Sequence, residues 1–400
     1  MATLKQAVER LRENGKLPRS STISLRDLHH NFSPSPAGST RALLSKLFEG
    51  VSSHLPWAII LCRFKDDAPN PAVEGPVEKF YREIFTPGTG GLIEYWRDAS
   101  RGAIDILGTR VFNWVEVDIT REKAGGSPIT IPAGPGRSGL VDAAIRAVQG
   151  RGEDPLQGFH SQIAVYTQNW SKDGMTQEGV EWKDWAPFWI DGSADGRGKV
   201  TLTPPHVGDI TAHEMGHGFG MNHDVSADFQ THYADPCCIM SQSPLFRHPV
   251  WDVMFGPTVC LPHLVQRGWM YTHRLYTDDG AWMSAPAGIT LPLAPIDDPG
   301  AHANLGIKLA FRKPGDSWDY YLEYVKPTDW NQGLSDAFVF IRRIGPGKDV
   351  GPTPAILDKI KVPSVPGVQI QQVEPSGNVQ FQVEWFDPAG RILKVTAIKL

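Results

Sequence analysis

The sequence predicts an α/β layer domain followed by a β-sandwich-like domain. At 400 residues and 44.1 kDa, the chain is longer than one hydrophobic core usually fills. As far as about Trp269, short apolar runs alternate with amphipathic helical patterns, which is typical of α/β layers. Beyond this point the helical periodicity largely disappears and short alternating runs replace it. We therefore expect three segments: residues 1–50 as a helix and a polar arm, 51–274 as the α/β domain, and 275–400 as the β-rich domain.

The expected elements follow from apolar spacing. The run WAIILCRF at 57–64 has the length of a strand and predicts one that is buried. Further along the α/β domain, the spacing predicts helices at 77–84, 92–99 and 139–149, and strands at 103–107, 111–117, 161–167 and 199–203. In the β-rich domain, alternation predicts strands at 307–311, 320–325, 337–341, 379–386 and 392–400. The turn residues DPAG at 387–390 predict that the last two strands form a hairpin.

Composition argues against several classes of protein. Hydrophobic residues make up 41% and charged residues 21%, which argues against wholesale disorder. A net charge of −5 and a pI of about 6.2 argue against a general nucleic-acid binder. No stretch reaches the ~18 apolar residues of a membrane helix, and the N-terminal residues lack the apolar region of a signal peptide. Four cysteines are too few for a disulfide scaffold; a local bridge to Cys260 and free buried thiols both stay open for Cys62, Cys237, Cys238 and Cys260.

The motif that carries chemistry is HEMGHGFGMNHD at 213–224. On a helix, His213 and His217 lie one turn apart on the same face, where two neutral imidazoles can bind one Zn²⁺. Glu214 projects beside the metal and can act as a general base toward a water molecule. Asp209 is expected to cap the N-terminus of this helix.

The second half of the motif supplies a third ligand. Gly220 stands where the chain must leave the helix and turn back, because glycine adopts positive φ without the Cβ penalty. His223, six residues after His217, then reaches the metal. Three protein ligands leave a fourth position for water, which is the catalytic rather than the structural arrangement of zinc. This interpretation requires that the three imidazoles converge and that the Glu214 carboxylate is not buried away from solvent.

The motif resembles the elongated zinc motif of the metzincin metalloproteases. The segment CCIMSQ, which follows His223, places Met240 in the setting of this family's Met-turn, where a methionine lies beneath the three imidazoles. Segments 94–117 and 320–344 are similar to the immune-inhibitor-A and gametolysin-like peptidases. The resemblance covers about 57–345 and implies a metzincin-like α+β or α/β catalytic domain with an active-site helix.

The resemblance implies roles for individual residues. The implied zinc ligands and general base are His213, His217, His223 and Glu214. The strand that contains Val200, Thr201 and Leu202 would be the edge against which an extended peptide pairs. Asp224 would brace the Met-turn region, or simply favour a turn. Some members have a tyrosine two residues after the methionine as a metal ligand or oxyanion donor; Gln242 stands there, and His232 and Tyr233 are weaker alternatives for that role.

We therefore expect a zinc-dependent endopeptidase with one Zn²⁺, a protein or peptide substrate, no nucleic-acid partner, no membrane span and a monomeric state. Two alternatives stay open: a catalytically weak, zinc-stabilised binding protein, and a zinc amidohydrolase that acts on a non-protein amide. Asp191 and Asp195 are compatible with a calcium loop, but the EF-hand pattern is absent and Ca²⁺ stays unsupported. The family resemblance suggests secretion, whereas the sequence as given suggests a cytoplasmic location or non-classical export.

Overall fold

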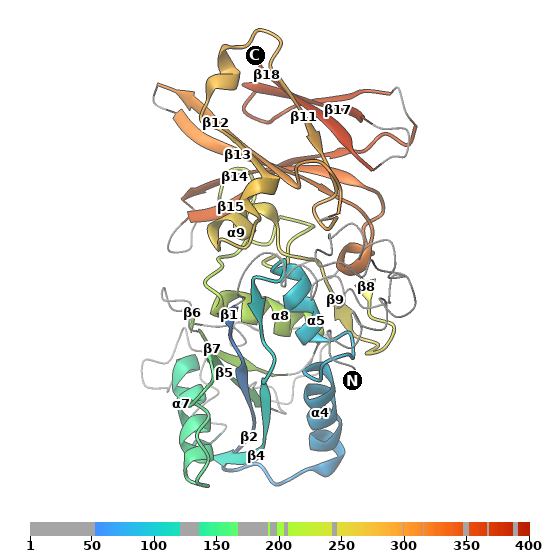
Figure 1. Cartoon of the computed structure of the whole chain (residues 1–400). Coiled ribbons are helices and arrows are strands. Elements are labelled where there is room, and N and C mark those ends of the chain that lie inside the picture. The colour runs from blue at the N-terminus through green and yellow to red at the C-terminus, as the bar shows by residue number, and fades with distance from the viewer. Residues whose placement is uncertain are drawn as a thin grey trace, which may run out of the picture.

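The computed structural model describes residues 53–120, 136–166, 191–192, 198–203, 207–241, 246–298, 300–314, 316–346, 352–365, 368–386 and 391–400. The helix and arm expected at 1–50 lie outside these residues. The described chain is mixed α/β, with several sheets and few helices (Figure 1). Within these ranges, no helix combines the length and the apolar character that a membrane crossing requires.

A five-stranded sheet forms the centre of the N-terminal half. Its strand order is β4-β2-β5-β7-β6, with β6 antiparallel to an otherwise parallel sheet. The strands are β2 (Trp57–Phe64), β4 (Arg110–Val117), β5 (Ser161–Tyr166), β6 (Asp191–Gly192) and β7 (Gly198–Leu202). The first six residues of β2 have no exposed surface, because their side chains point alternately into two separate hydrophobic clusters. The strands predicted at 57–64, 111–117, 161–167 and 199–203 are confirmed to within a residue at either end.

Helices cover both faces of this sheet (Figure 1). Helix α7 (Gly136–Gln149) packs on one face, and α4 (Pro71–Ile84), α5 (Leu92–Ala99) and α8 (Gly208–Gly218) contribute to the cluster on the other. Helix α4 begins at Pro71 rather than at the predicted Val77, since proline is favoured in the first turn, where its missing N–H has no cost. The strand predicted at 103–107 is reduced to β3 (Ile104–Asp105), which pairs with β1 (Ser53–His54).

The C-terminal half contains two β-sheets that enclose one hydrophobic cluster (Figure 1). In order across the first sheet, the strands are β10 (Leu275–Asp278), β12 (Gly306–Lys313), β13 (Asp316–Val325), β14 (Phe338–Pro346) and β15 (Pro352–Lys361). Across the second they are β11 (Ile289–Leu293), β18 (Leu393–Lys399), β17 (Val379–Trp385) and β16 (Ile370–Val373). The expected β-rich C-terminal region is present, and β17 pairs with β18 as an antiparallel hairpin.

Two of the strands that the sequence did not predict contain proline. Strand β15 includes Pro352 and Pro354, and β11 includes Pro292. Proline cannot donate a hydrogen bond to a neighbouring strand, so the sequence pattern weighs against a strand at these places. Both strands lie at the edge of their sheets, the position where a missing N–H is tolerated.

Between the two halves run β8 (Phe246–Arg247), β9 (Met254–Phe255), α9 (Leu261–Gln266) and the short 3₁₀ segment η2 (Thr272–Arg274). Another 3₁₀ segment, η3 (Ala281–Ser284), follows β10 in the C-terminal half. A further 3₁₀ segment, η4 (Asp329–Asn331), carries Trp330 back to the N-terminal half. The Trp330 ring lies 5.1 Å from that of Tyr95 and 5.4 Å from that of Phe255, measured between centroids. One hydrophobic cluster therefore extends across residue 274 and joins the two halves.

Asp98 on α5 lies at this junction. Its Oδ2 accepts a hydrogen bond from Nε1 of Trp330 at 3.0 Å. Burial raises the pKa of the Asp98 carboxyl to about 7, although the bond from Trp330 and the charge of Arg97 oppose the rise. Because this pKa lies above that of an unfolded aspartate, the protonated carboxyl contributes stability fully below about pH 4, and this contribution is lost as the pH rises through about 7.

We expect Asp98→Asn to remove this pH dependence, because asparagine is neutral and keeps an oxygen that accepts from Trp330. Between about pH 5 and pH 8, the free energy of unfolding of the wild type should fall relative to the variant by roughly 2 kcal/mol. Urea denaturation at several pH values measures the difference. The exposed Asp279→Asn is the matched control and should follow the wild-type curve; an Asp98→Asn curve parallel to the wild type would contradict the assignment.

Candidate metal centre

Helix α8 carries the first half of the histidine motif. Its N-cap is Val207, which is extended with φ −135° and ψ 156° and makes no side-chain capping bond. The prediction that Asp209 caps the helix was wrong, because the helix already begins at Gly208 and Asp209 lies within its first turn. A carboxylate in the first turn still stabilises the helix, because it lies near the positive, N-terminal end of the helix dipole. Burial raises the pKa of Asp209 to about 6.

Gly220 reverses the chain after α8. Its φ is +80°, in the left-handed region that favours glycine. The N–H groups of Gly220 and Met221 donate back to the carbonyl oxygens of His217 and Gly216 at 2.7 and 3.1 Å, which closes the helix end. The reversal brings His223 to the same place as the two helical histidines, as the sequence predicts.

The three histidines form a compact group, here called the three-histidine site: His213, His217 and His223. Each contributes one ring nitrogen, and the three nitrogens lie within 4.8 Å of one another. The Nε2 atoms of His217 and His223 are 3.0 Å apart. Two nitrogens bound at 2.0–2.1 Å to one tetrahedral ion would lie about 3.3 Å apart, so the rings need to move only slightly. This group could hold a metal ion, and its all-imidazole donor set suits a divalent transition metal.

Hydrogen bonds orient two of these rings. Nδ1 of His213 lies 2.7 Å from the carbonyl oxygen of Ile239, and Nδ1 of His217 lies 2.8 Å from that of Met221. A carbonyl accepts only from a protonated nitrogen, so in both neutral rings Nε2 keeps its lone pair for a metal. Burial, together with the charges of His217 and His223, holds the pKa of His213 well below its usual range. At neutral pH this imidazole is therefore in the form that binds metals.

Met240 lies against α8 between the first two histidines. A Cβ built on Gly216 would come 2.4 Å from the sulfur of Met240, which is fully buried. The N–H of Asp224 also donates to the carbonyl oxygen of Met240 at 3.0 Å. The segment around Met240 thus contacts both the helix and the residue that follows His223.

Glu214 differs from the sequence expectation. It neighbours His213 on α8, but its side chain has no exposed surface, whereas the interpretation of the motif required a carboxylate that is not buried. That condition is not met. The cause is the position of Glu214 on the face of α8 that packs into the protein, together with Thr211, Met215 and Gly218. His217 and His223 are partly exposed, so solvent reaches the site from the side of these two rings.

Tyr233 reaches the three-histidine site from a loop. Its hydroxyl lies 3.2 Å from Nε2 of His223, and the two rings are 4.6 Å apart between centroids. Tyr233 has a φ of +61°, which is strained for a bulky side chain, and its N–H donates to the carbonyl oxygen of Asp224 at 2.8 Å. His232 also lies next to His223, with 5.1 Å between the centroids of the two rings. The other position considered for this role, Gln242, lies outside the described residues.

The strand predicted as the edge of the sheet, β7, is the second strand from the edge, because β6 lies outside it. Strand β7 pairs with β5 on one side, and on the other its Gly198 and Lys199 pair with the antiparallel β6. The prediction of an edge at 199–203 was wrong because a two-residue strand without a hydrophobic pattern is invisible in the sequence. Val200, Thr201 and Leu202 are buried, and substrate binding by them stays a prediction.

Asp195, one of the two residues considered for a calcium loop, lies outside the described part of the chain.

A second group of possible metal ligands was missed by the sequence interpretation. It consists of Asp224, Cys238, Cys260 and His263, here called the Asp–Cys–Cys–His cluster, and it could also hold a metal ion. All four cysteines of the chain are free thiols and buried. The overlooked signal was CLPH at 260–263, in which a cysteine and a histidine are spaced so that one helical turn brings them together.

Comparisons with known proteins add no assignment to this geometry, because neither the protein-family models nor the curated proteins gave a match to the chain.

Gly216 offers a test of the contact with Met240. Gly216→Ala should force the buried Met240 sulfur away and cost about 1–3 kcal/mol of unfolding free energy, and it should weaken the binding of any metal ion at the three-histidine site. Denaturant unfolding and a competitive zinc titration measure the two effects. The control is Gly75→Ala on α4, where a Cβ meets nothing within 4 Å and should stabilise the helix by about 0.5–1 kcal/mol. Equal stability of Gly216→Ala and the wild type would show that the packing is looser than described.

Proposed function

We propose that the protein is a zinc-dependent endopeptidase of the metzincin type, with the three-histidine site as its catalytic centre. The observation that supports this most strongly is the convergence of His213, His217 and His223 with a carboxylate, Glu214, next to the first of them in the chain. Three protein ligands leave a divalent ion with an open position, and two of the three histidines are partly exposed to solvent. Such a site can accept a substrate group, which a closed structural site cannot.

When bound there, a zinc ion would supply Lewis acidity, polarising a scissile carbonyl and lowering the pKa of a water toward ~7. The residues of the chain do the rest. The Glu214 carboxylate accepts a proton from the attacking water and later gives it to the amine that leaves, so that one peptide bond and one water become a carboxylic acid and an amine. A buried carboxylate can perform this transfer if the water lies between it and the histidines, because only the water must touch it.

Tyr233 is positioned to assist the same reaction. Its hydroxyl is a hydrogen-bond donor beside His223 and can donate to the oxygen that becomes negative as the carbonyl is attacked. A phenol has this capacity without changing its protonation state. We therefore assign Tyr233 the role of oxyanion donor within the proposed endopeptidase.

A second candidate function is a zinc-stabilised binding protein with weak catalysis. The observation that favours it is the complete burial of Glu214, since a base that no water reaches has no catalytic use. The two functions differ in one measurable property, the hydrolysis of a denatured protein such as casein in the presence of zinc.

We expect the zinc-loaded protein to cleave casein, and a chelator to abolish the cleavage. Glu214→Gln should lower the rate by at least about 10²-fold, because the general base is lost, while the zinc content stays as in the wild type. Cleavage measured by release of acid-soluble peptides, with zinc measured by mass spectrometry, tests both statements. The exposed Glu83→Gln on α4 is the control and should retain full activity.

The outcomes separate the two functions. Casein cleavage at wild-type rate by Glu214→Gln would remove Glu214 from the mechanism. Zinc binding without any cleavage by the wild type would favour the binding protein.

For Tyr233→Phe we expect kcat to fall by about 10²-fold and KM to change by less than about twofold, because the hydroxyl acts on the transition state rather than on bound substrate. Steady-state kinetics on a fluorogenic peptide, cleaved by the wild type, measures both constants. A variant with unchanged kcat would show that the hydroxyl takes no part in the reaction, and a rise in KM alone would show that it only binds substrate.

A further inference from the structure

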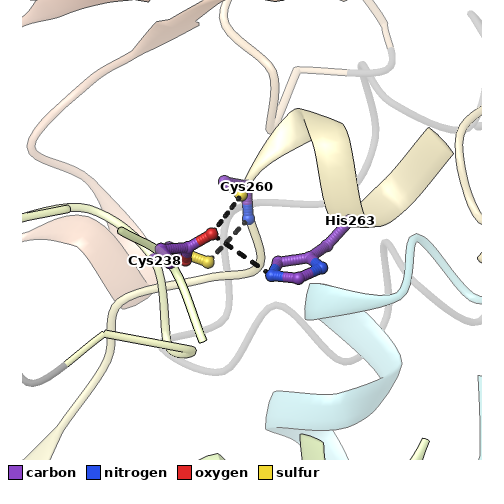
Figure 2. A group of neighbouring side chains, drawn as sticks. Cys238, Cys260 and His263 are labelled. Atoms are coloured by element: carbon purple, nitrogen blue, oxygen red, sulfur yellow. Dashed lines mark hydrogen bonds and ion pairs between the residues drawn. The ribbon is translucent and has the colours of Figure 1, made fainter. Parts of the chain in front are cut away.

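We propose that Asp224, Cys238, Cys260 and His263 form a second, structural site for a divalent transition metal such as Zn²⁺, independent of the hydrolysis proposed above. One ligand atom of each residue lies within 4.8 Å of the others. Figure 2 shows the side chains of Cys238, Cys260 and His263 pointing toward one another. Nε2 of His263 is 3.2 Å from Oδ1 of Asp224, and Sγ of Cys260 is 3.7 Å from the same oxygen.

The cluster is entirely buried, yet its polar atoms are poorly satisfied. His263 and Asp224 have at most 1% of their side chains exposed. Among the described residues, Nδ1 of His263 and Oδ2 of Asp224 find no hydrogen-bond partner, and Nε2 of His263 has only its 3.2 Å ion-pair contact with Asp224. A buried polar group without a partner costs about 1–3 kcal/mol, so two such atoms in one cluster indicate that a partner is missing. A metal ion accepts the lone pairs of all four side chains at once.

The donor set is that of zinc. Two sulfurs, one imidazole nitrogen and one carboxylate oxygen give four ligands, the number that closes a tetrahedral structural site. Soft thiolates select zinc or Cu(I) over magnesium and calcium, which prefer oxygen. The free thiols are poor ligands until a cation binds, because burial raises the pKa of both Cys238 and Cys260. Binding would therefore release the two thiol protons to solvent and replace them by the ion.

The surrounding charges also favour a cation. Next to the cluster, the buried guanidinium of Arg342 is paired with the carboxylates of both Asp235 and Glu323. Glu323 also accepts a hydrogen bond from the N–H of Leu261, the residue after Cys260, at 2.9 Å. Together with Asp224, three buried carboxyl groups and one guanidinium lie in and next to the cluster. A divalent ion would offset this excess of negative charge, which is costly in a buried region.

A metal here would link three segments that support the three-histidine site. Asp224 directly follows His223, and Cys238 lies two residues before Met240. Cys260 and His263 belong to the start of α9, which packs against β13 and β14 of the C-terminal half. The ion would thus fasten the loop of the third histidine and the Met240 segment to the C-terminal sheet. With four protein ligands it has no position for a substrate, so its role is structural.

The test uses the full-length wild-type chain, refolded with excess zinc or cobalt(II) and then desalted. We expect about two zinc ions per chain by mass spectrometry. With cobalt, the two thiolates should give an intense near-ultraviolet charge-transfer absorption that three imidazoles cannot give. Both thiols should resist alkylation until a chelator is added, after which the denatured chain should show all four of its cysteines as free thiols.

Variants separate the two sites. Cys238→Ser and His263→Ala should each lower the metal content to about one per chain and remove or weaken the cobalt–thiolate band. Cys237→Ser is the matched control, because Cys237 is the adjacent buried cysteine and its sulfur lies near Asn331 rather than in the cluster. It should keep both metals and the band. The double variant His217→Ala/His223→Ala should lose one metal and keep the band, whether or not the protein is a peptidase.

Three results overturn the proposal, and the first two come from the wild type and need no variant to fold. One is the absence of the cobalt–thiolate band. Another is a disulfide between Cys238 and Cys260, seen as only two free thiols in the denatured, unreduced chain and mapped to this pair by peptide mass spectrometry. The third is a band that persists in both Cys238→Ser and Cys260→Ser, which would place the thiolate ligand elsewhere.

Discussion

The position of His223 is the constraint on which the candidate site depends. His213 and His217 need only a helix, but His223 must be returned to them by the irregular loop that follows Gly220. Backbone hydrogen bonds hold this loop at several points: one runs from Asp224 to the carbonyl of Met240, and the next residue, Val225, both donates to and accepts from β15. A loop fixed in this way loses its freedom when the protein folds, so a metal meets a preorganised site and does not have to order the loop.

The C-terminal half is therefore part of the site's construction. Strand β15 forms backbone hydrogen bonds with the loop after His223. Arg342 on β14 donates hydrogen bonds to the carbonyl oxygen of Cys237 and to the carboxylate of Asp235. These are buried, fully desolvated interactions. The net energy of such an ion pair is small, but the loss of one partner is strongly destabilising, so the pair fixes one arrangement of the chain rather than adding much stability. Together with the hydrophobic cluster around Trp330, they make the two halves one packed structure.

Patterns over a few residues of the sequence predicted the features that depend on contacts between residues close together in the chain. Strand β2 was predictable because its apolar run fills two clusters, and α5 because its period is helical. The histidine spacing predicted the convergence of three rings, since one helical turn brings the first two together and Gly220 lets the chain turn back toward them. The edge strands with proline and the two-residue β6 left no such pattern. The burial of Glu214 and the approach of Tyr233 depend on tertiary packing, which spacing along the chain does not encode.

The two clusters differ in the property that separates catalysis from structure. The three-histidine site keeps two rings partly exposed and has three ligands, whereas every member of the Asp–Cys–Cys–His cluster is buried and the ligand count is complete at four. They meet at one peptide bond, because His223 and Asp224 are neighbours. A displacement of Asp224 must therefore move His223, and a displacement of His223 must move Asp224. Binding at either cluster would change binding at the other by the same free energy, so a closed, four-ligand site would help to hold the third imidazole of the open one in place.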